Sequence, residues 1–152
     1  MGHVHVRAHG AVPPERFVAA LTDFGPGREE IWGNSDPRDL VVHDRGDTWA
    51  DVTEGAAAGG VWQRLRYDWS APDVVTLTVL DSNAFGPGSQ WTYRLDPDGR
   101  GGTDIDLTVV RVPSTPKGRV MDILLSLGGG LFFARDLRRT LRRLESRAGT
   151  PS

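Results

Sequence analysis

The chain has 152 residues, of which 38% are hydrophobic and 25% are charged, as in an ordinary globular domain. Its formal net charge of −2 argues against nucleic-acid binding and against a general electrostatic attraction to anionic membranes. Because the chain contains no cysteine, disulfides, thiol nucleophiles and thiolate metal sites are excluded.

No stretch of the sequence has the length and hydrophobicity of a transmembrane helix. The longest apolar stretch, residues 123–133, is interrupted by Ser126 and by three consecutive glycines at positions 128–130. The N-terminal residues contain no hydrophobic signal region. We therefore expect a cytoplasmic protein, monomeric or homodimeric, with one domain over residues 1–148 and a disordered tail over residues 149–152.

The first half of the chain reads as a strand, two short helices and the start of a series of strands. Residues 3–12 alternate between polar and apolar side chains, which predicts a half-buried strand. Pro13 and Pro14 open a predicted helix that stops at Gly25 and Pro26, and residues 28–32 form a second helical turn. Turn signals then separate six further predicted strands, at residues 40–45, 48–54, 61–69, 74–81, 90–95 and 103–111.

A long helix is predicted over residues 115–147. Ser114, Thr115 and Pro116 supply a cap and a proline at the first helical position. An unbroken helix of this length would span about 45 Å, and the strands offer it one surface, a curved antiparallel sheet. We expect its apolar stripe to lie against that sheet, with space for a ligand between them. The stripe recurs every three or four residues, at Val120, Leu124, Leu127, Leu131, Ala134, Leu137, Leu141 and Leu144.

Four local strings, together with the order of the elements, resemble the START-like helix-grip (SRPBCC) superfamily. They are residues 14–18 directly after the opening strand, residues 64–69, residues 88–95 and residues 137–144. This superfamily includes lipid-transfer domains, polyketide cyclases and aromatases, and pathogenesis-related plant allergens. The resemblance covers nearly the whole chain and implies an α+β helix-grip fold. In that fold a seven-stranded curved antiparallel sheet wraps around a long C-terminal helix, two short helices follow the first strand, and the interior holds an apolar cavity.

Aromatic side chains on the predicted strands are the first candidates for ligand contacts. Tyr67 and Trp69 share one strand face, and Trp91 and Tyr93 share another. These rings can fill the space between sheet and helix, or they can line a cavity.

The three helix glycines favour a cavity as one of two explanations. Three glycines cost a helix about 3 kcal/mol relative to alanine, and either room for a ligand or a tight helix–sheet contact would account for them. We therefore add helix residues to the predicted ligand contacts, namely Leu124, Leu127, Gly128 and Leu131.

The arginines have two interpretations each. Arg111 continues the apolar face of Leu107 and Val109, so it could point inward and anchor a ligand carboxylate or enolate. It could equally reach solvent past the end of its strand. The arginines in the last turns of the long helix are expected to form a solvated face that suits the helix dipole.

The sequence predicts no metal ion and no cofactor. His3, His5 and His9 share one face of the first strand, and we interpret them as an outward, solvated row because no cysteine or carboxylate accompanies them at ligand spacing. A cluster of acids follows a hairpin and is assigned to its exposed face: Asp44, Asp47, Asp51 and Glu54. Serine-elbow, phosphate-loop and dinucleotide motifs are absent from the sequence.

Two functions from different classes remain. The first, which we favour, is non-catalytic binding or transport of a small hydrophobic ligand such as a lipid, a polyketide or an aromatic metabolite. The second is an enzyme of the polyketide cyclase or aromatase type, in which a pocket folds a reactive chain and polar side chains steer enolate chemistry. Its candidate residues are Arg64, Tyr67, Tyr93 and Arg111. A weaker third possibility is a protein-interaction role for the groove or the basic helix end.

Overall fold

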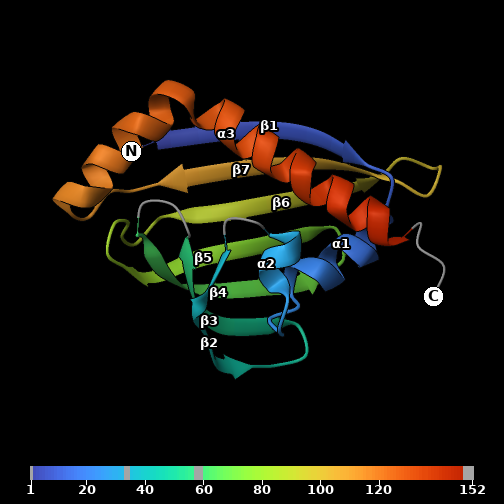
Figure 1. The fold of residues 1–152 in the computed structure, drawn as a ribbon, viewed down its shortest axis with the longest axis horizontal. Helices are drawn as coiled ribbons and strands as arrows, with labels where there is room; N and C mark the ends of the chain where they lie inside the picture. Colours follow the sequence, from blue (N-terminus) through green and yellow to red (C-terminus); the bar gives the residue numbers. More distant parts are fainter. Residues whose placement is uncertain (1, 33–34, 57–59, 149–152) are drawn as a thin grey trace.

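The structure is a computed structural model that describes residues 2–32, 35–56 and 60–148. It has the expected α+β arrangement of one sheet, two short helices and one long helix (Figure 1). The predicted tail, residues 149–152, lies outside the described residues. The elements are β1 (Gly2–Gly10), α1 (Pro14–Leu21), α2 (Arg28–Ile31), β2 (Ser35–Arg45), β3 (Trp49–Ala56), β4 (Trp62–Ala71), β5 (Val74–Ser82), β6 (Gln90–Pro97), β7 (Thr103–Arg111) and α3 (Pro116–Ala148).

The seven strands form one sheet in the order β1-β7-β6-β5-β4-β3-β2, with every neighbouring pair antiparallel. The first strand therefore pairs with the last, and β2 to β7 follow one another as a meander. Figure 1 shows α3 crossing the face of the sheet at the β1 side, while α1 and α2 lie over the other part of the same face. The three helices thus cover one face of the sheet, and the core lies between them and the strands.

The alternation of the strands explains which side chains enter this core. In β7, Ile105, Leu107 and Val109 are buried, whereas the residues between them are more exposed. Val75 and Leu77 of β5 are buried in the same way. Because successive side chains of a strand point to opposite faces, each strand contributes every second residue to the helix-covered face.

The helix α1 closes the end of the core opposite to the start of α3. Pro14 occupies its first turn, where the missing N–H is not needed for a helical hydrogen bond. Phe17 and Leu21 are its buried residues, and the Phe17 ring lies 5.6 Å from that of Tyr93 and 5.9 Å from that of Trp32 between centroids. This aromatic group fixes α1 and the segment after α2 on the sheet.

The two halves of α3 have different surroundings, and the predicted stripe is correct for only one of them. In the second half Leu137, Leu141 and Leu144 are buried. In the first half Leu127 and Leu131 are 83% and 82% exposed, so the prediction that the whole stripe faces the sheet is wrong there. The stripe takes seven steps over 24 positions, a repeat shorter than the helical turn, so it drifts around the helix and reaches the sheet only near the C-terminal end.

The first half of α3 is nevertheless held firmly by its inner side. The Thr115 hydroxyl donates to the Asn83 carbonyl oxygen at 2.8 Å and accepts from the Gly118 amide at 3.1 Å, which caps the helix. Gly118 lies so close to the Ala84 carbonyl that there is no room for a Cβ. Met121 then packs on a small buried cluster that includes Ala84.

Candidate functional site

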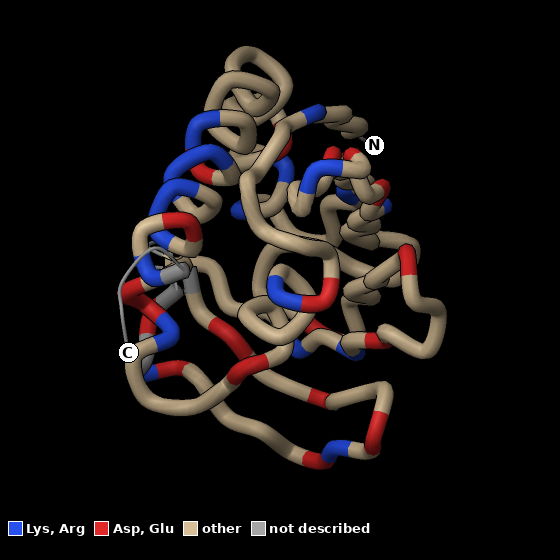
Figure 2. The backbone as a smooth tube through the Cα atoms, turned by 90° about the vertical axis from the view of Figure 1, so that its right-hand side faces the viewer, with Lys and Arg blue, Asp and Glu red and all other residues tan. Residues whose placement is uncertain are grey.

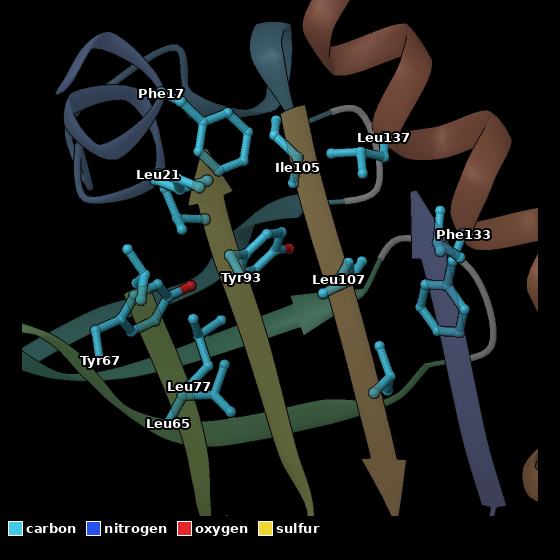
Figure 3. Packing of buried hydrophobic residues seen from close by; sticks show 14 of the residues in the cluster. Phe17, Leu21, Leu65, Tyr67, Leu77, Tyr93, Ile105, Leu107, Phe133 and Leu137 are labelled. Atoms are coloured by element: carbon cyan, nitrogen blue, oxygen red, sulfur yellow. The ribbon is translucent and has the colours of Figure 1, made fainter. Parts of the chain in front are cut away.

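A cavity of about 160 Å³ lies between the sheet and the three helices. Figure 3 shows side chains from α1, the strands and α3 that converge on this region. Most of the wall is apolar, and aromatic rings contribute to it from β4, β6 and α3. The lining residues are Leu21, Arg28, Trp32, Glu54, Gly55, Val61, Gln63, Leu65, Tyr67, Leu77, Trp91, Tyr93, Leu107, Phe133, Asp136 and Leu137.

A buried polar cluster of Arg28, Glu54 and Tyr67 forms one end of the cavity wall. The Arg28 side chain is 4% exposed, and its Nε donates to Glu54 Oε1 at 2.8 Å. Its Nη2 donates to the Tyr67 hydroxyl at 3.1 Å, and that hydroxyl donates in turn to Glu54 Oε2. Each member of the cluster therefore forms a hydrogen bond with both of the others, so that these buried polar groups all have partners.

The remaining contacts of Arg28 leave it little capacity for a ligand. Its Nη1 donates to the carbonyl oxygens of Asp23 at 2.7 Å and Ala20 at 3.4 Å, so four of its five N–H donors have protein partners. The guanidinium also stacks near the Phe24 ring, at 4.8 Å from the centroid. The charge of Arg28 is thus used within the protein, where it ties α1, α2 and β3 together.

The protonation states of the cluster follow from its burial. Burial raises the pKa of Tyr67 well above that of an ordinary phenol, and the Glu54 carboxylate adds to the rise while Arg28 opposes it. Burial acts to lower the pKa of Arg28, but Tyr67 and Glu54 outweigh it and the net pKa is raised. At neutral pH Tyr67 is therefore a neutral phenol and Arg28 is a fully charged guanidinium.

Tyr93 and Asp136 bring two more polar groups to the cavity wall. Burial raises the pKa of Tyr93, and Asp136 raises it further. Burial also raises the pKa of Asp136, against the lowering influence of Arg143 and Arg139. Within the described part of the chain, neither the Tyr93 hydroxyl nor the Asp136 carboxyl forms a hydrogen bond. Both groups therefore have hydrogen-bonding capacity to offer to a molecule in the cavity.

Comparison by sequence finds no protein-family model and no curated protein that matches the chain. Comparison by structure finds similar proteins along its whole length. The Zhui aromatase/cyclase from Streptomyces sp. R1128 superposes with a TM-score of 0.79 at 17% identity, covering 99% of each chain. A START superfamily protein from Mycobacterium smegmatis gives a TM-score of 0.68 at 12% identity and 95% coverage of each chain. The major latex-like protein 151 of Panax ginseng gives 0.60 at 12% identity, covering 98% of each chain.

The chain has the helix-grip fold. The superpositions confirm the resemblance that the sequence indicated, at the level of the fold, and the predicted strand and helix order is correct. No helix in the described part of this helix-grip chain has the length and hydrophobicity needed to cross a bilayer.

Three of the nine predicted ligand contacts line the helix-grip cavity: Tyr67, Trp91 and Tyr93. Trp69, which shares a strand with Tyr67, is half-buried at the margin of the core and does not line the cavity. That these three residues contact a ligand remains a prediction, and their position in the cavity wall supports it.

Arg111 has the inward direction of the first of its two interpretations, but it does not line the cavity. It points inward and is 3% exposed, but its Nε donates to Asp122 Oδ1 of α3 at 3.0 Å, away from the cavity. Its Nη1 is buried without a hydrogen-bond partner among the described residues. Arg64 also lies outside the cavity, in a bidentate pair with Asp51. Neither arginine lines this cavity, and each forms an ion pair with a carboxylate of another element.

The helix residues predicted as ligand contacts lie on the outer side of α3. Leu124, Leu127 and Leu131 are 58%, 83% and 82% exposed, and Gly128 has open space around it within the described structure. Gly129 instead lies against the sheet, where a Cβ would stand 3.4 Å from Val4 Cγ2. A tight helix–sheet contact therefore explains Gly129, and none of the three glycines borders the cavity.

Sequence reasoning missed Arg28, Glu54 and Asp136, and two of these had a usable signal. Glu54 was assigned to an exposed face, but it follows Ala50 and Val52 at intervals of two, and both are fully buried. That alternation places Glu54 on the inner face, as the structure does. Asp136 follows the buried Phe133 by three positions and precedes the buried Thr140 by four, so helical spacing places it on the inner side of α3.

The histidines of β1 form the exposed row that was predicted, with His5 and His9 side chains 53% and 54% exposed. Each has a carboxylate partner from elsewhere in the chain: His5 Nε2 lies 2.5 Å from Asp106 Oδ1, and His9 Nε2 lies 2.7 Å from Asp98 Oδ2. Among the described residues, no group of three or more potential ligands could hold a metal ion.

Proposed function

We propose that this helix-grip chain binds a small, neutral, largely apolar molecule that carries a hydroxyl or carbonyl group. One observation carries the proposal: an apolar cavity wall surrounds two polar groups, Tyr93 and Asp136, that have no hydrogen-bond partner among the described residues. Concave apolar sites with a few convergent polar groups are the usual form of a small-molecule site.

The volume of the cavity supports a compact ligand. An engineered apolar cavity of about 150 Å³ is sufficient for benzene, and the cavity here measures about 160 Å³. Among the lipid, polyketide and aromatic classes that the sequence left open, this favours a molecule built on one or two rings.

The charges of the cavity support a neutral ligand. Arg28, the cation in the cavity wall, is paired with Glu54 and has few N–H groups to spare. Arg111 is paired with Asp122 outside the cavity. A ligand carboxylate would therefore meet no free positive charge, and its burial would be costly.

Three naphthalene derivatives of similar size test this proposal. We expect calorimetric titration to give the tightest binding for 2-naphthol, weaker binding for naphthalene and the weakest for 2-naphthoate. Tyr93→Phe should weaken 2-naphthol binding about five- to tenfold, the usual contribution of one hydrogen bond, and should leave naphthalene binding unchanged.

The control is Leu127→Ala, since Leu127 is 83% exposed and lies outside the cavity. We expect it to leave binding of all three compounds unchanged. Tighter binding of 2-naphthoate than of 2-naphthol, or an equal loss in Leu127→Ala and Tyr93→Phe, would contradict the proposal.

Catalysis of the cyclase or aromatase type is a second candidate, and Asp136 is the observation that favours it. Burial raises the pKa of this carboxyl group, which lines a ligand-sized space together with the Tyr93 hydroxyl, and carboxyl groups with perturbed pKa values serve as general acids and bases. Tyr67 and Tyr93 line the cavity as this hypothesis requires, whereas Arg64 and Arg111 do not.

A spontaneously cyclising polyketone would distinguish the two candidates. A cyclase should change the ratio of ring products, and Asp136→Asn should return the ratio toward the spontaneous one while binding persists. If the wild-type protein binds the chain and leaves the ratio untouched, the binding function stands alone. The cytoplasmic location and the oligomeric state stay predictions.

A further inference from the structure

Five apolar side chains on the outer side of α3 form an exposed ridge, here called the outer leucine face. Their exposed fractions are 57% for Val120, 62% for Ile123, 58% for Leu124, 83% for Leu127 and 82% for Leu131. They recur at three- and four-residue intervals, so they share one side of the helix. Contiguous exposed apolar surface of this kind usually marks an interaction site.

The ridge belongs to a helix segment that is fixed in place. On the opposite side of the same turns, Gly118 and Met121 pack against the segment around Ala84. Asp122 pairs with the buried Arg111, and Gly129 lies close to Val4. The outer leucine face cannot turn inward without breaking these contacts, so it must face solvent or a partner.

Positive charges lie at both ends of the outer leucine face. Lys117 and Arg119 precede it and are exposed, and the exposed arginines after it follow Leu131 at helical spacing. Figure 2 shows Lys and Arg residues following one another along the part of α3 that leads toward the C-terminus. The arginines that continue the outward side are Arg135, Arg138 and Arg142.

The acidic residues of this stretch are turned away from the face. Asp122 is held by Arg111, and Asp136 borders the cavity. Between residues 116 and 143 these are the two acids of the helix, so the exposed side chains there are apolar or positive, apart from Ser126.

This charge pattern disfavours a second copy of the chain as the partner. In a two-fold pairing of outer leucine faces, the basic end of one helix would meet a basic end of the other in either direction, because both ends are positive. Like charges brought together in an interface are costly. A partner with negative charge over apolar material fits the face instead.

We propose that the outer leucine face docks on the surface of an anionic lipid bilayer. The protruding leucines enter the boundary between headgroups and acyl chains, and the flanking lysine and arginines contact lipid phosphates. An apolar helix side flanked by lysine and arginine is the pattern by which helices lie on anionic bilayers. The net charge of −2 does not oppose this, because charges farther than about 8 Å away are screened at physiological salt.

Co-sedimentation with vesicles tests the proposal. We expect the wild-type protein to sediment with vesicles of phosphatidylcholine and phosphatidylglycerol, to bind pure phosphatidylcholine much more weakly, and to be released by high salt. The double variant Leu127→Ser with Leu131→Ser, and separately Arg138→Glu with Arg142→Glu, should each lower vesicle binding at least about tenfold.

The matched control is Val41→Ser with Leu80→Ser, which removes two exposed apolar side chains, 49% and 48% exposed, from the sheet. It should bind vesicles as the wild type does. Because the substituted leucines and arginines are exposed, circular dichroism should show all variants folded, and the two double variants test the face independently.

Three results would overturn the proposal. The wild-type protein could fail to sediment with anionic vesicles, or the leucine and arginine variants could bind as well as the wild type. Alternatively, analytical ultracentrifugation without lipid could show a dimer that the leucine variant abolishes, which would assign the face to self-association.

Discussion

The second half of α3 buries its leucines against the sheet, whereas the first half presents the same kind of residue to solvent. Leu141 is 2% exposed and Leu127 is 83% exposed, although both belong to one apolar stripe in one continuous helix. Figure 1 shows the helix bent between these two parts. The two halves have similar hydrophobic composition and periodicity. Their leucines differ in burial because the two halves lie differently relative to the sheet.

An apolar stripe in the sequence thus predicted the helix correctly, but it did not predict which side of the helix is buried. Besides Met121 and Leu125, the inner side of the first half contains residues that are not typical of a core: Gly118, Asp122 and Gly129. Small residues allow the backbone to approach the sheet, and an ion pair replaces apolar contact. Leu124, Leu127 and Leu131 therefore lie on the outside, available for another surface.

The largest expected effect on the free energy of unfolding comes from truncating Leu141, and truncating Leu127 is the comparison. Leu141→Ala should lower the free energy of unfolding by about 2–5 kcal/mol, because it opens a cavity where Leu141 packs on Gly10 of β1. Leu127→Ala should change it by less than about 0.5 kcal/mol. Urea unfolding of both variants measures the difference, and equal losses would mean that Leu127 is buried in solution.

The glycines give the second test. Gly118→Ala should lower the free energy of unfolding by about 1–3 kcal/mol, since the new Cβ would collide with the Ala84 carbonyl oxygen, which belongs to the backbone and cannot easily move. Gly130 has open space around it within the described structure and no positive φ, so Gly130→Ala should raise stability by up to about 1 kcal/mol. Thermal and urea unfolding should move in opposite directions for the two variants. A loss of stability in Gly130→Ala would show that the bend of α3 requires this glycine.

The smallest expected effect on stability concerns Asp122 and Asp136, the acids on the inner side of the two halves of α3. Asp122 is neutralised by Arg111, whereas burial raises the pKa of Asp136. The folded chain therefore keeps the Asp136 proton to a higher pH than the unfolded chain does, and this group lowers stability as the pH rises from its ordinary pKa through the raised one. Asp136→Asn removes that penalty.

The measurement is the difference in melting temperature between Asp136→Asn and the wild type, taken at about pH 4 and at about pH 7. We expect the variant to gain relative to the wild type at the higher pH. A difference that does not change with pH would place Asp136 in contact with water or with a cation in the folded protein.

The sequence by itself determined the fold of this protein. Alternation in residues 103–111 and 74–81, prolines at the start of two helices and glycine turns between strands are local signals, and each acts over a few residues. Their order, together with four strings that resemble those of helix-grip proteins, was sufficient to predict the sheet and the long helix. Alternation also placed Tyr67 with Trp69, and Trp91 with Tyr93, on shared strand faces, and all of these except Trp69 line the cavity.

The tertiary structure decided the rest of the candidate site, because its residues meet only when distant elements pack. Arg28 comes from a four-residue helix and finds Glu54 and Tyr67 on two separate strands. The pairing of Arg111 with Asp122, and the outward rotation of Leu127, depend on how the start of α3 sits against β1 and Ala84. Periodicity fixes which side chains of an element share a face, but the surface that each face meets is set by the packing of the whole chain.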